Sequence, residues 1–122
     1  MEKKPSQRKF HRNNSHNLIH YVVLKQDGKP LYDYLGRTLN VSEGGILLET
    51  YKPLYLDRHV IITIAIDEEM IELTGRVVHV KHTQNDRFHS GIEFINLSEH
   101  GKRVLQWYMA AINNKKSGPF RT

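Results

Sequence analysis

Hydrophobic and polar residues alternate over several short stretches of the chain, as in strands that bury one face. The clearest stretch runs from residue 59 to 67, where one face collects Val60, Ile62, Ile64 and Ile66. Further stretches, rich in β-branched and aromatic residues, lie at 17–26, 31–42, 46–50, 70–82 and 88–95. Turn-forming residues separate them, including the Asp-Gly pair at 27–28. The pattern predicts six strands joined by short connections.

A different spacing near the end of the chain predicts the one convincing helix, over residues 99–113. Ser98 is a suitable N-cap. Apolar residues then recur at helical spacing and form a single stripe: Val104, Leu105, Tyr108, Ala111 and Ile112. Trp107 lies at the edge of this stripe, and we expect it to belong to the helix core.

Six short strands with one apolar face suggest a small antiparallel barrel or sandwich, because closure of the sheet protects its edges. The helix stripe should cover one end of it. With 122 residues, 39% hydrophobic and 25% charged, the chain is expected to form one globular domain. We predict an arm without regular structure at 1–16, the folded body at 17–113 and a mobile tail at 114–122.

Composition excludes several classes of protein. The chain has no cysteine, so disulfides, thiolate metal sites and a cysteine nucleophile are excluded. Its apolar runs are too short to span a bilayer, and its amino terminus is polar. These features favour a soluble, cytoplasmic protein that does not insert into membranes.

The formal net charge of +5 is unevenly distributed. Basic residues gather at the two ends, as Lys3, Lys4, Arg8, Lys9 and Arg12 and as Lys115, Lys116 and Arg121. The segment between them is mildly acidic, which argues against a broad nucleic-acid-binding face. A basic arm that closes over one small anion fits this distribution better.

No catalytic or metal-binding pattern stands out. His79 and His82 are three apart on a predicted strand and should face opposite ways, and no tight cluster of metal ligands is present. Ser42 lacks the strand-turn-helix context of a nucleophile, and no glycine loop opens a helix. We therefore expect neither an enzyme nor a metal or cofactor site.

Two short motifs carry the functional prediction. Arg8 and Arg12 fit R-x-x-x-R in the arm, and residues 40–45, Asn-Val-Ser-Glu-Gly-Gly, fit [D/N]-x-S-x-x-G at the end of the second predicted strand. Asn40 and Ser42 would project to the same side of that strand. The two glycines would allow either a positive φ or a close approach of another group to the backbone, as in a hairpin turn with a bulge.

This pair of motifs, ahead of a strand meander and a carboxy-terminal helix, resembles the PilZ domain, a bacterial receptor for cyclic di-GMP. Residues 90–94, Ser-Gly-Ile-Glu-Phe, also look like the last strand of that family. The resemblance covers roughly residues 7–112 and implies a six-stranded antiparallel barrel with a flexible basic arm. It also implies a single-domain receptor that signals to an unidentified partner protein in control of motility, exopolysaccharide or biofilm.

The resemblance assigns ligand-binding roles to five residues: Arg8, Arg12, Asn40, Ser42 and Gly45. The arginines would close over the nucleotide, because a guanidinium can bind the guanine edge, stack on it or pair with phosphate. Asn40 and Ser42 would form hydrogen bonds with guanine or phosphate, and Gly45 would leave room for the purine. Neighbouring candidates are Gln7, Lys9 and Gly44, and in the family the residue before the first arginine is implicated in whether one nucleotide or a stacked pair binds.

Two other functions remain open. A domain of this fold that has lost nucleotide binding could act only as a protein-interaction module, although the intact motifs argue against this. A small basic barrel could instead bind single-stranded nucleic acid, but that function calls for aromatic residues interleaved with basic ones on a strand face. Phe10 is the only aromatic residue in the arm.

Overall fold

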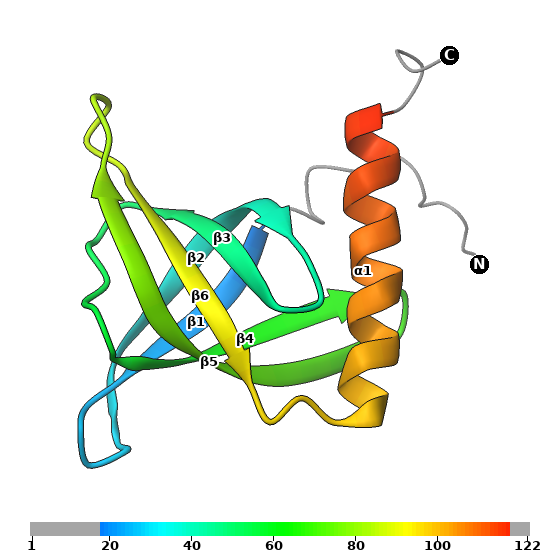
Figure 1. Ribbon diagram of the computed structural model, residues 1–122, viewed down its shortest axis with the longest axis horizontal. Helices are drawn as coiled ribbons and strands as arrows, with labels where there is room; N and C mark the ends of the chain where they lie inside the picture. The colour runs from blue at the N-terminus through cyan, green and yellow to red at the C-terminus, as the bar shows by residue number, and fades with distance from the viewer. Residues whose placement is uncertain (1–17, 118–122) are drawn as a thin grey trace.

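The computed structural model describes residues 18–117, with side chains described to residue 112. It contains six strands followed by one helix (Figure 1). The strands are β1 (Leu18–Leu24), β2 (Pro30–Val41), β3 (Gly45–Thr50), β4 (His59–Ile66), β5 (Glu69–His82) and β6 (Phe88–Ile95), and the helix is α1 (Glu99–Ser117). The six strands predicted from alternation are all confirmed, with ends that shift by a residue or two.

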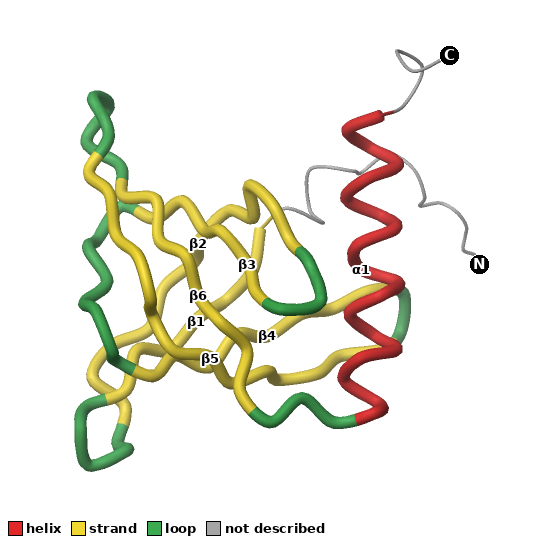
Figure 2. Tube along the Cα trace, viewed as in Figure 1, coloured by secondary structure: helices red, strands yellow, loops and turns green. Residues whose placement is uncertain are grey.

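The strands form a closed antiparallel barrel in the order β1-β2-β3-β6-β5-β4, so the prediction of a barrel is confirmed and a sandwich is excluded. Figure 2 shows the ring of strands with loops at its ends and α1 standing beside one end. The predicted inner face of β4 points into the barrel, since Val60, Ile62 and Ile64 are fully buried. This continuous apolar interior stabilises the ring.

The helix begins as predicted, because the Ser98 hydroxyl accepts a hydrogen bond from the Gly101 amide at 2.9 Å. Its apolar stripe packs beside β4 and β5, with Val104, Leu105, Tyr108 and Ile112 buried. The expected end at 113 was too early, because the helix continues to Ser117. Lysines at 115 and 116 are good helix formers, and positive charge is favourable near a helix carboxyl end.

Tyr108 joins the helix to the barrel wall. Its hydroxyl lies 2.6 Å from the Thr38 hydroxyl of β2, and both side chains are buried. Burial raises the pKa of Tyr108 to about 12, so the phenol stays neutral and can share this hydrogen bond over the whole physiological range. The helix therefore contacts the strand that leads into the predicted site.

The prediction for Trp107 was wrong. This residue is 51% exposed on the outer side of α1, although the stripe next to it is buried. The apolar stripe of a helix covers a limited arc, and Trp107 lies just beyond the part that reaches the strands. The exposed ring therefore contributes little to the core.

Candidate functional site

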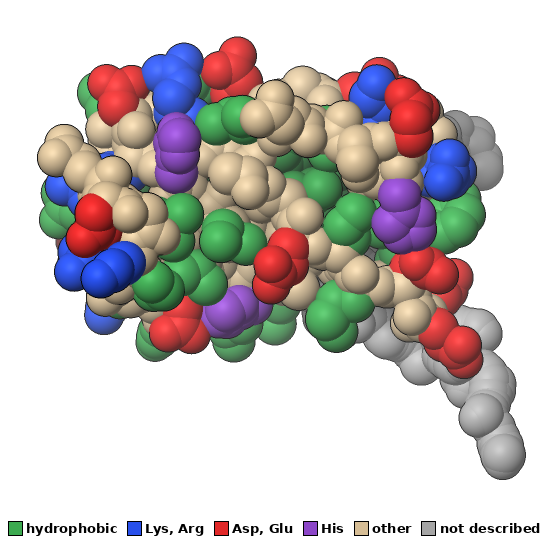
Figure 3. Space-filling view, turned by 90° about the horizontal axis from the view of Figure 1, so that it is seen from below, with side chains coloured by type: hydrophobic (Ala, Val, Ile, Leu, Met, Phe, Trp, Pro, Cys, Tyr) green, Lys and Arg blue, Asp and Glu red, His purple; other side chains and the backbone are tan. Residues whose placement is uncertain are grey.

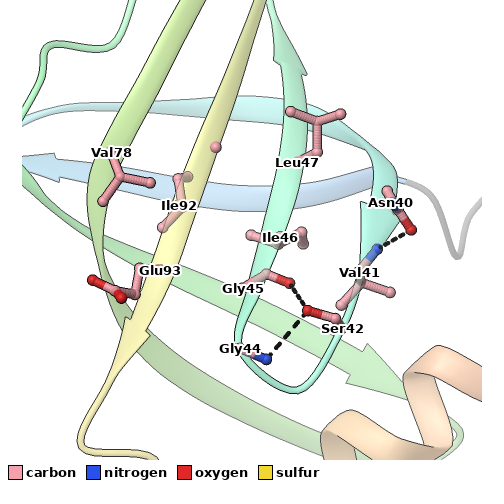
Figure 4. A pocket seen from close by; sticks show the side chains of 11 residues that line it. Asn40, Val41, Ser42, Gly44, Gly45, Ile46, Leu47, Val78, Ile92 and Glu93 are labelled. Carbon is pink, nitrogen blue, oxygen red and sulfur yellow. Dashed lines mark hydrogen bonds between the residues drawn. The ribbon is translucent and has the colours of Figure 1, made fainter.

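A shallow, open depression of about 350 Å³ lies on the outer face of the barrel, across β2, β3, β6 and β5. The residues that line it come from the end of β2, the following turn and the facing parts of the other three strands (Figure 4). They are Asn40, Val41, Ser42, Gly44, Gly45, Ile46, Leu47, Val78, Gly91, Ile92 and Glu93. The structure thus brings the four predicted residues of the second motif, Asn40, Ser42, Gly44 and Gly45, to one pocket.

Ser42 closes the turn between β2 and β3 with its own backbone and side chain. Its amide donates to the Gly45 carbonyl at 2.9 Å. Its hydroxyl accepts a hydrogen bond from the Gly44 amide at 3.2 Å and lies 3.5 Å from the Gly45 carbonyl oxygen (Figure 4). The hydroxyl is exposed as well, so it can serve both the turn and a ligand.

Asn40 lies on β2 as predicted, but Ser42 does not, so the two side chains do not come from one strand. The register of β2 against β3 shifts between Thr38 and Asn40, which is the mark of a β-bulge, and β2 ends at Val41, before Ser42. The Oδ1 atom of Asn40 accepts a hydrogen bond from the Val41 amide at 2.9 Å (Figure 4). This bond orients the side-chain amide, whose nitrogen can then donate to an acceptor in the pocket.

The two glycines differ in what the backbone requires of them. Neither has a positive φ. At Gly45 the alternative of close approach holds, because a Cβ atom there would overlap the Ile92 carbonyl oxygen of β6. At Gly44 a Cβ would meet only the Ser42 hydroxyl, at 3.9 Å. The missing side chain at 45 therefore has a structural cause that does not depend on any ligand.

An ion-pair network crosses three of these four strands, β2, β3 and β6, beside the pocket. Arg37 of β2 binds Glu49 of β3 at 2.8 Å, and His89 of β6 lies 3.0 Å from the other oxygen of that carboxylate. Hydrogen bonds from His89 and then from Arg37 lower the pKa of the Glu49 carboxyl, outweighing its partial burial. The network fixes β2, β3 and β6 relative to one another next to the depression.

One further basic side chain near the depression is paired with two carboxylates. Arg76 of β5 contacts Asp57 at 2.7 Å and Glu93 at 3.2 Å. On the face drawn in Figure 3, acidic and basic side chains are interspersed with hydrophobic ones, and the described residues form no extended basic surface there.

Other predicted residues lie outside the part that the structure describes. Gln7, Arg8, Lys9 and Arg12 all precede residue 18, so their roles stay predictions. Within the described residues, no three His, Asp or Glu side chains are grouped so that they could hold a metal ion. In the same part of the chain, no helix is both long and apolar enough to cross a membrane.

Sequence reasoning missed part of the pocket wall. Leu47, Val78 and Glu93 line the depression but were not candidates. A signal existed for Glu93, which lies in the segment 90–94 that resembled a family strand. A local signal also existed for Val78, which follows the buried Val77 and so faces outward by the alternation of β5.

A comparison with models of protein families identifies the relationship. The model described as the PilZ domain matches residues 6–111. The chain belongs to the PilZ domain family. The matched range takes in both motifs, including Arg8 and Arg12. No curated protein sequence matches the chain.

Several solved structures share this PilZ fold. A PilZ domain with c-di-GMP of YcgR from Escherichia coli has a TM-score of 0.59 and 15% identity, and the match covers 85% of this chain and 90% of that one. The complex of K. pneumonia MrkH with c-di-GMP has a TM-score of 0.59 and 16% identity over 81% of this chain, but only 48% of MrkH. A PilZ domain of CeSA from a cellulose-synthesizing bacterium has a TM-score of 0.55 and 19% identity, with coverage of 79% and 93%. The chain therefore spans about half of MrkH and most of the two isolated domains.

Proposed function

We propose that this PilZ domain is a receptor for cyclic di-GMP and that the depression on the outer face of the barrel is its binding site. The observation that carries the proposal is the convergence of Asn40, Ser42 and Gly45 on that single depression. Two proteins of similar fold, YcgR and MrkH, have been solved with this nucleotide. That likeness supports the choice of ligand.

The charge of the pocket indicates which other residues the ligand needs. Cyclic di-GMP carries two phosphate charges, yet the described lining contains no Lys or Arg and includes the acidic Glu93. A dianion would bind such a surface poorly without cations from elsewhere. Arg8 and Arg12 of the first motif are the natural source, and each could bind phosphate or the O6 and N7 atoms of guanine.

Asn40 and Ser42 would contribute directed hydrogen bonds at the edge of the site. The amide of Asn40 is already oriented by its bond to Val41, and the hydroxyl of Ser42 is held by the turn. Groups that are fixed before binding lose little conformational entropy when they engage a ligand. The turn would thus act as a preformed edge, and the arginines would complete the site.

Signal output would follow from closure of the arginine-bearing segment over the nucleotide. Neutralising its positive charge against the phosphates would favour a single bound arrangement of residues 8–12. The surface formed in this way would be read by a partner protein, in a process such as motility, exopolysaccharide production or biofilm formation. This scheme describes an adaptor without catalytic activity.

Isothermal titration of the purified protein with cyclic di-GMP tests the proposal, with GTP and cyclic di-AMP as controls. We expect saturable binding at micromolar concentration or tighter for cyclic di-GMP alone, together with a stoichiometry of one or two. Absence of binding at high protein concentration would refute the receptor function and favour a PilZ domain that acts only through protein contacts. Equal affinity for unrelated single-stranded nucleic acid, falling steeply with salt, would favour the nucleic-acid alternative.

A matched pair of variants locates the site. Asn40→Ala removes the oriented amide and should weaken binding about tenfold. Loss of one directed hydrogen bond costs about 1.4 kcal/mol, which corresponds to a tenfold change in the dissociation constant. Asn85→Ala makes the same chemical change in the turn between β5 and β6, outside the depression. It should bind like the native protein. Equal affinities of the two variants would move the site elsewhere.

A further inference from the structure

A second hollow on the barrel surface is separate from the proposed nucleotide site. Its volume is about 460 Å³, and its lining comes from β1, β2, the end of β3 and Arg87 in the turn that precedes β6. Along β2, Arg37 separates the two features, because Asn40 lines the depression and Leu35 lines the hollow. The turn that holds Arg87 projects away from α1, whereas the β2–β3 turn lies beside α1 (Figure 1). No residue lines both features.

Exposed apolar side chains gather in this hollow. Four of the ten large hydrophobic residues that are exposed in the described part of the chain line it: Leu18, Tyr34, Leu35 and Tyr51. Each of the four is between 47% and 59% exposed. Gly36 and Thr50, which are buried, form the floor. Clustered apolar surface of this kind commonly marks an interaction site, and the hollow has the size of a small binding pocket.

Two basic side chains lie against the tyrosine rings of the hollow. The guanidinium carbon of Arg87 is 4.1 Å from the centre of the Tyr51 ring, and its Nη2 donates a hydrogen bond to the Tyr51 hydroxyl at 3.1 Å. The Nζ atom of Lys52 lies 5.6 Å from the centre of the Tyr34 ring. Among the described residues, neither cation contacts a carboxylate. Both charges are therefore available to an acidic group from outside the domain.

We propose that the hollow is a docking site for an acidic segment of a partner protein, with an aromatic side chain of that segment in the hollow and its carboxylates against Arg87 and Lys52. The tyrosine walls favour an aromatic occupant, because aromatic rings attract one another in edge-to-face and offset arrangements. Tyrosine and arginine are also among the residues that most often carry the binding energy of protein interfaces. The proposal does not depend on nucleotide binding at the depression.

Acidic side chains next to the hollow disfavour a nucleic acid as its occupant. Asp33 precedes Tyr34 and Asp86 precedes Arg87, and both carboxylates are exposed. A single-stranded nucleic acid carries a charge on every phosphate and needs a basic groove that follows its backbone. The two carboxylates would interrupt such a groove. A short acidic segment needs cations only where its own few carboxylates lie.

A magnetic resonance titration of the isotope-labelled protein, followed through its amide signals and carried out without nucleotide, tests the proposal. The probe is the blocked peptide acetyl-Asp-Phe-Asp-amide. We expect weak, saturable binding, with shifts confined to amides around the hollow. Acetyl-Asn-Phe-Asn-amide lacks the charges and should bind about fivefold more weakly. Acetyl-Asp-Ala-Asp-amide lacks the ring and should leave these amides unchanged.

Two variants with matched controls locate the contacts. Leu35→Ser removes an apolar wall and Arg87→Gln removes a charge, and each should weaken binding of acetyl-Asp-Phe-Asp-amide about fivefold. Met70→Ser and Arg103→Gln make the equivalent changes at exposed positions outside the hollow and should bind like the native protein. Thermal unfolding without peptide should give all four variants a midpoint close to the native one. If a hollow variant fails to fold, the comparison of the three peptides still decides.

The docking site is refuted if the acidic peptide causes no shifts at millimolar concentration, or if the shifts fall on another face. It is also refuted if the folded hollow variants bind as well as their controls. Stronger shifts of the same amides by an oligothymidylate would refute it in favour of a nucleic acid. Calorimetry with cyclic di-GMP judges the receptor function separately, so either proposal can fail while the other stands.

Discussion

The two neighbouring glycines of the β2–β3 turn should respond in opposite ways to the same substitution. In Gly45→Ala the new methyl group would overlap the Ile92 carbonyl oxygen and approach the Glu93 Cα to 3.4 Å. Both obstacles are backbone atoms of β6, so β3 and β6 must separate locally. In Gly44→Ala the nearest atom is the Ser42 hydroxyl at 3.9 Å, and nothing has to move.

The magnitudes follow from this geometry. Overpacking usually costs about 1–3 kcal/mol, and an obstacle made of backbone places Gly45→Ala near the upper end, at about 3 kcal/mol. The pairing at risk begins at Gly45 and Glu93 and continues along the whole of β3. Gly44→Ala should change stability by less than about 0.5 kcal/mol, or increase it slightly, because alanine reduces the entropy of the unfolded chain.

Denaturant unfolding, followed by circular dichroism, measures both values in parallel. A loss of about 3 kcal/mol should also lower the melting temperature by roughly 10 °C for a domain of this size. If the two variants lose equal stability, or if Gly44→Ala is the less stable one, the account of the β3–β6 approach is wrong. A variant at Gly45 is therefore a poor test of ligand binding, because a folding defect would lower the affinity whether or not residue 45 contacts the ligand.

Three further predictions concern the ligand, the helix and the ion-pair network. Arg12→Ala should weaken cyclic di-GMP binding by about 2 kcal/mol or more, roughly thirtyfold in calorimetry, with an unchanged melting temperature; an unchanged dissociation constant would count against its assigned role. Tyr108→Phe should lower the free energy of unfolding by about 1–2 kcal/mol in urea, because the buried Thr38 hydroxyl loses its partner, and a neutral effect would contradict the helix-to-barrel bond. The pKa of Glu49 is lower in the folded than in the unfolded chain. Its ionised form therefore stabilises the fold above the unfolded pKa of about 4.3. This stabilisation is lost as the pH falls through the folded pKa. The native protein should therefore exceed Glu49→Gln in stability by about 1 kcal/mol at pH 7, allowing for the exposure of its Arg37 partner, and the difference should vanish in acid; a difference independent of pH would refute this reasoning.

The sequence was most informative where one physical signal acts alone. Alternation along β4 depends only on which face is buried, and it predicted the inner residues of that strand correctly. The cap at Ser98 is also local, since the side chain and the amide that it binds are three residues apart. Barrel closure followed less directly, from the number of strands and from the need to protect their edges.

Features that depend on distant neighbours could not be predicted. The bulges before Asn40 and at Val78 reflect how β2 and β5 must bend around a closed ring, and neither has a local pattern. Close approach to the backbone was one of two expectations for the glycine pair, but the sequence could not show that it applies at Gly45, because the obstacle belongs to β6, almost fifty residues later in the chain. Exposure of Trp107 depends on how far the helix stripe reaches over the barrel. Each of these is a tertiary effect that overrides local preference.

Closure of the barrel also restricts how another protein can recognise the domain. Many modules bind an extended peptide by adding it as a further strand to an exposed sheet edge. Here β1 pairs with β2 on one side and with β4 on the other, and the ring continues through every described strand. A partner therefore cannot add a strand to this barrel. A protein that recognises the domain must contact its side chains instead. The outer side of α1, where Trp107 is exposed, is a surface of that kind.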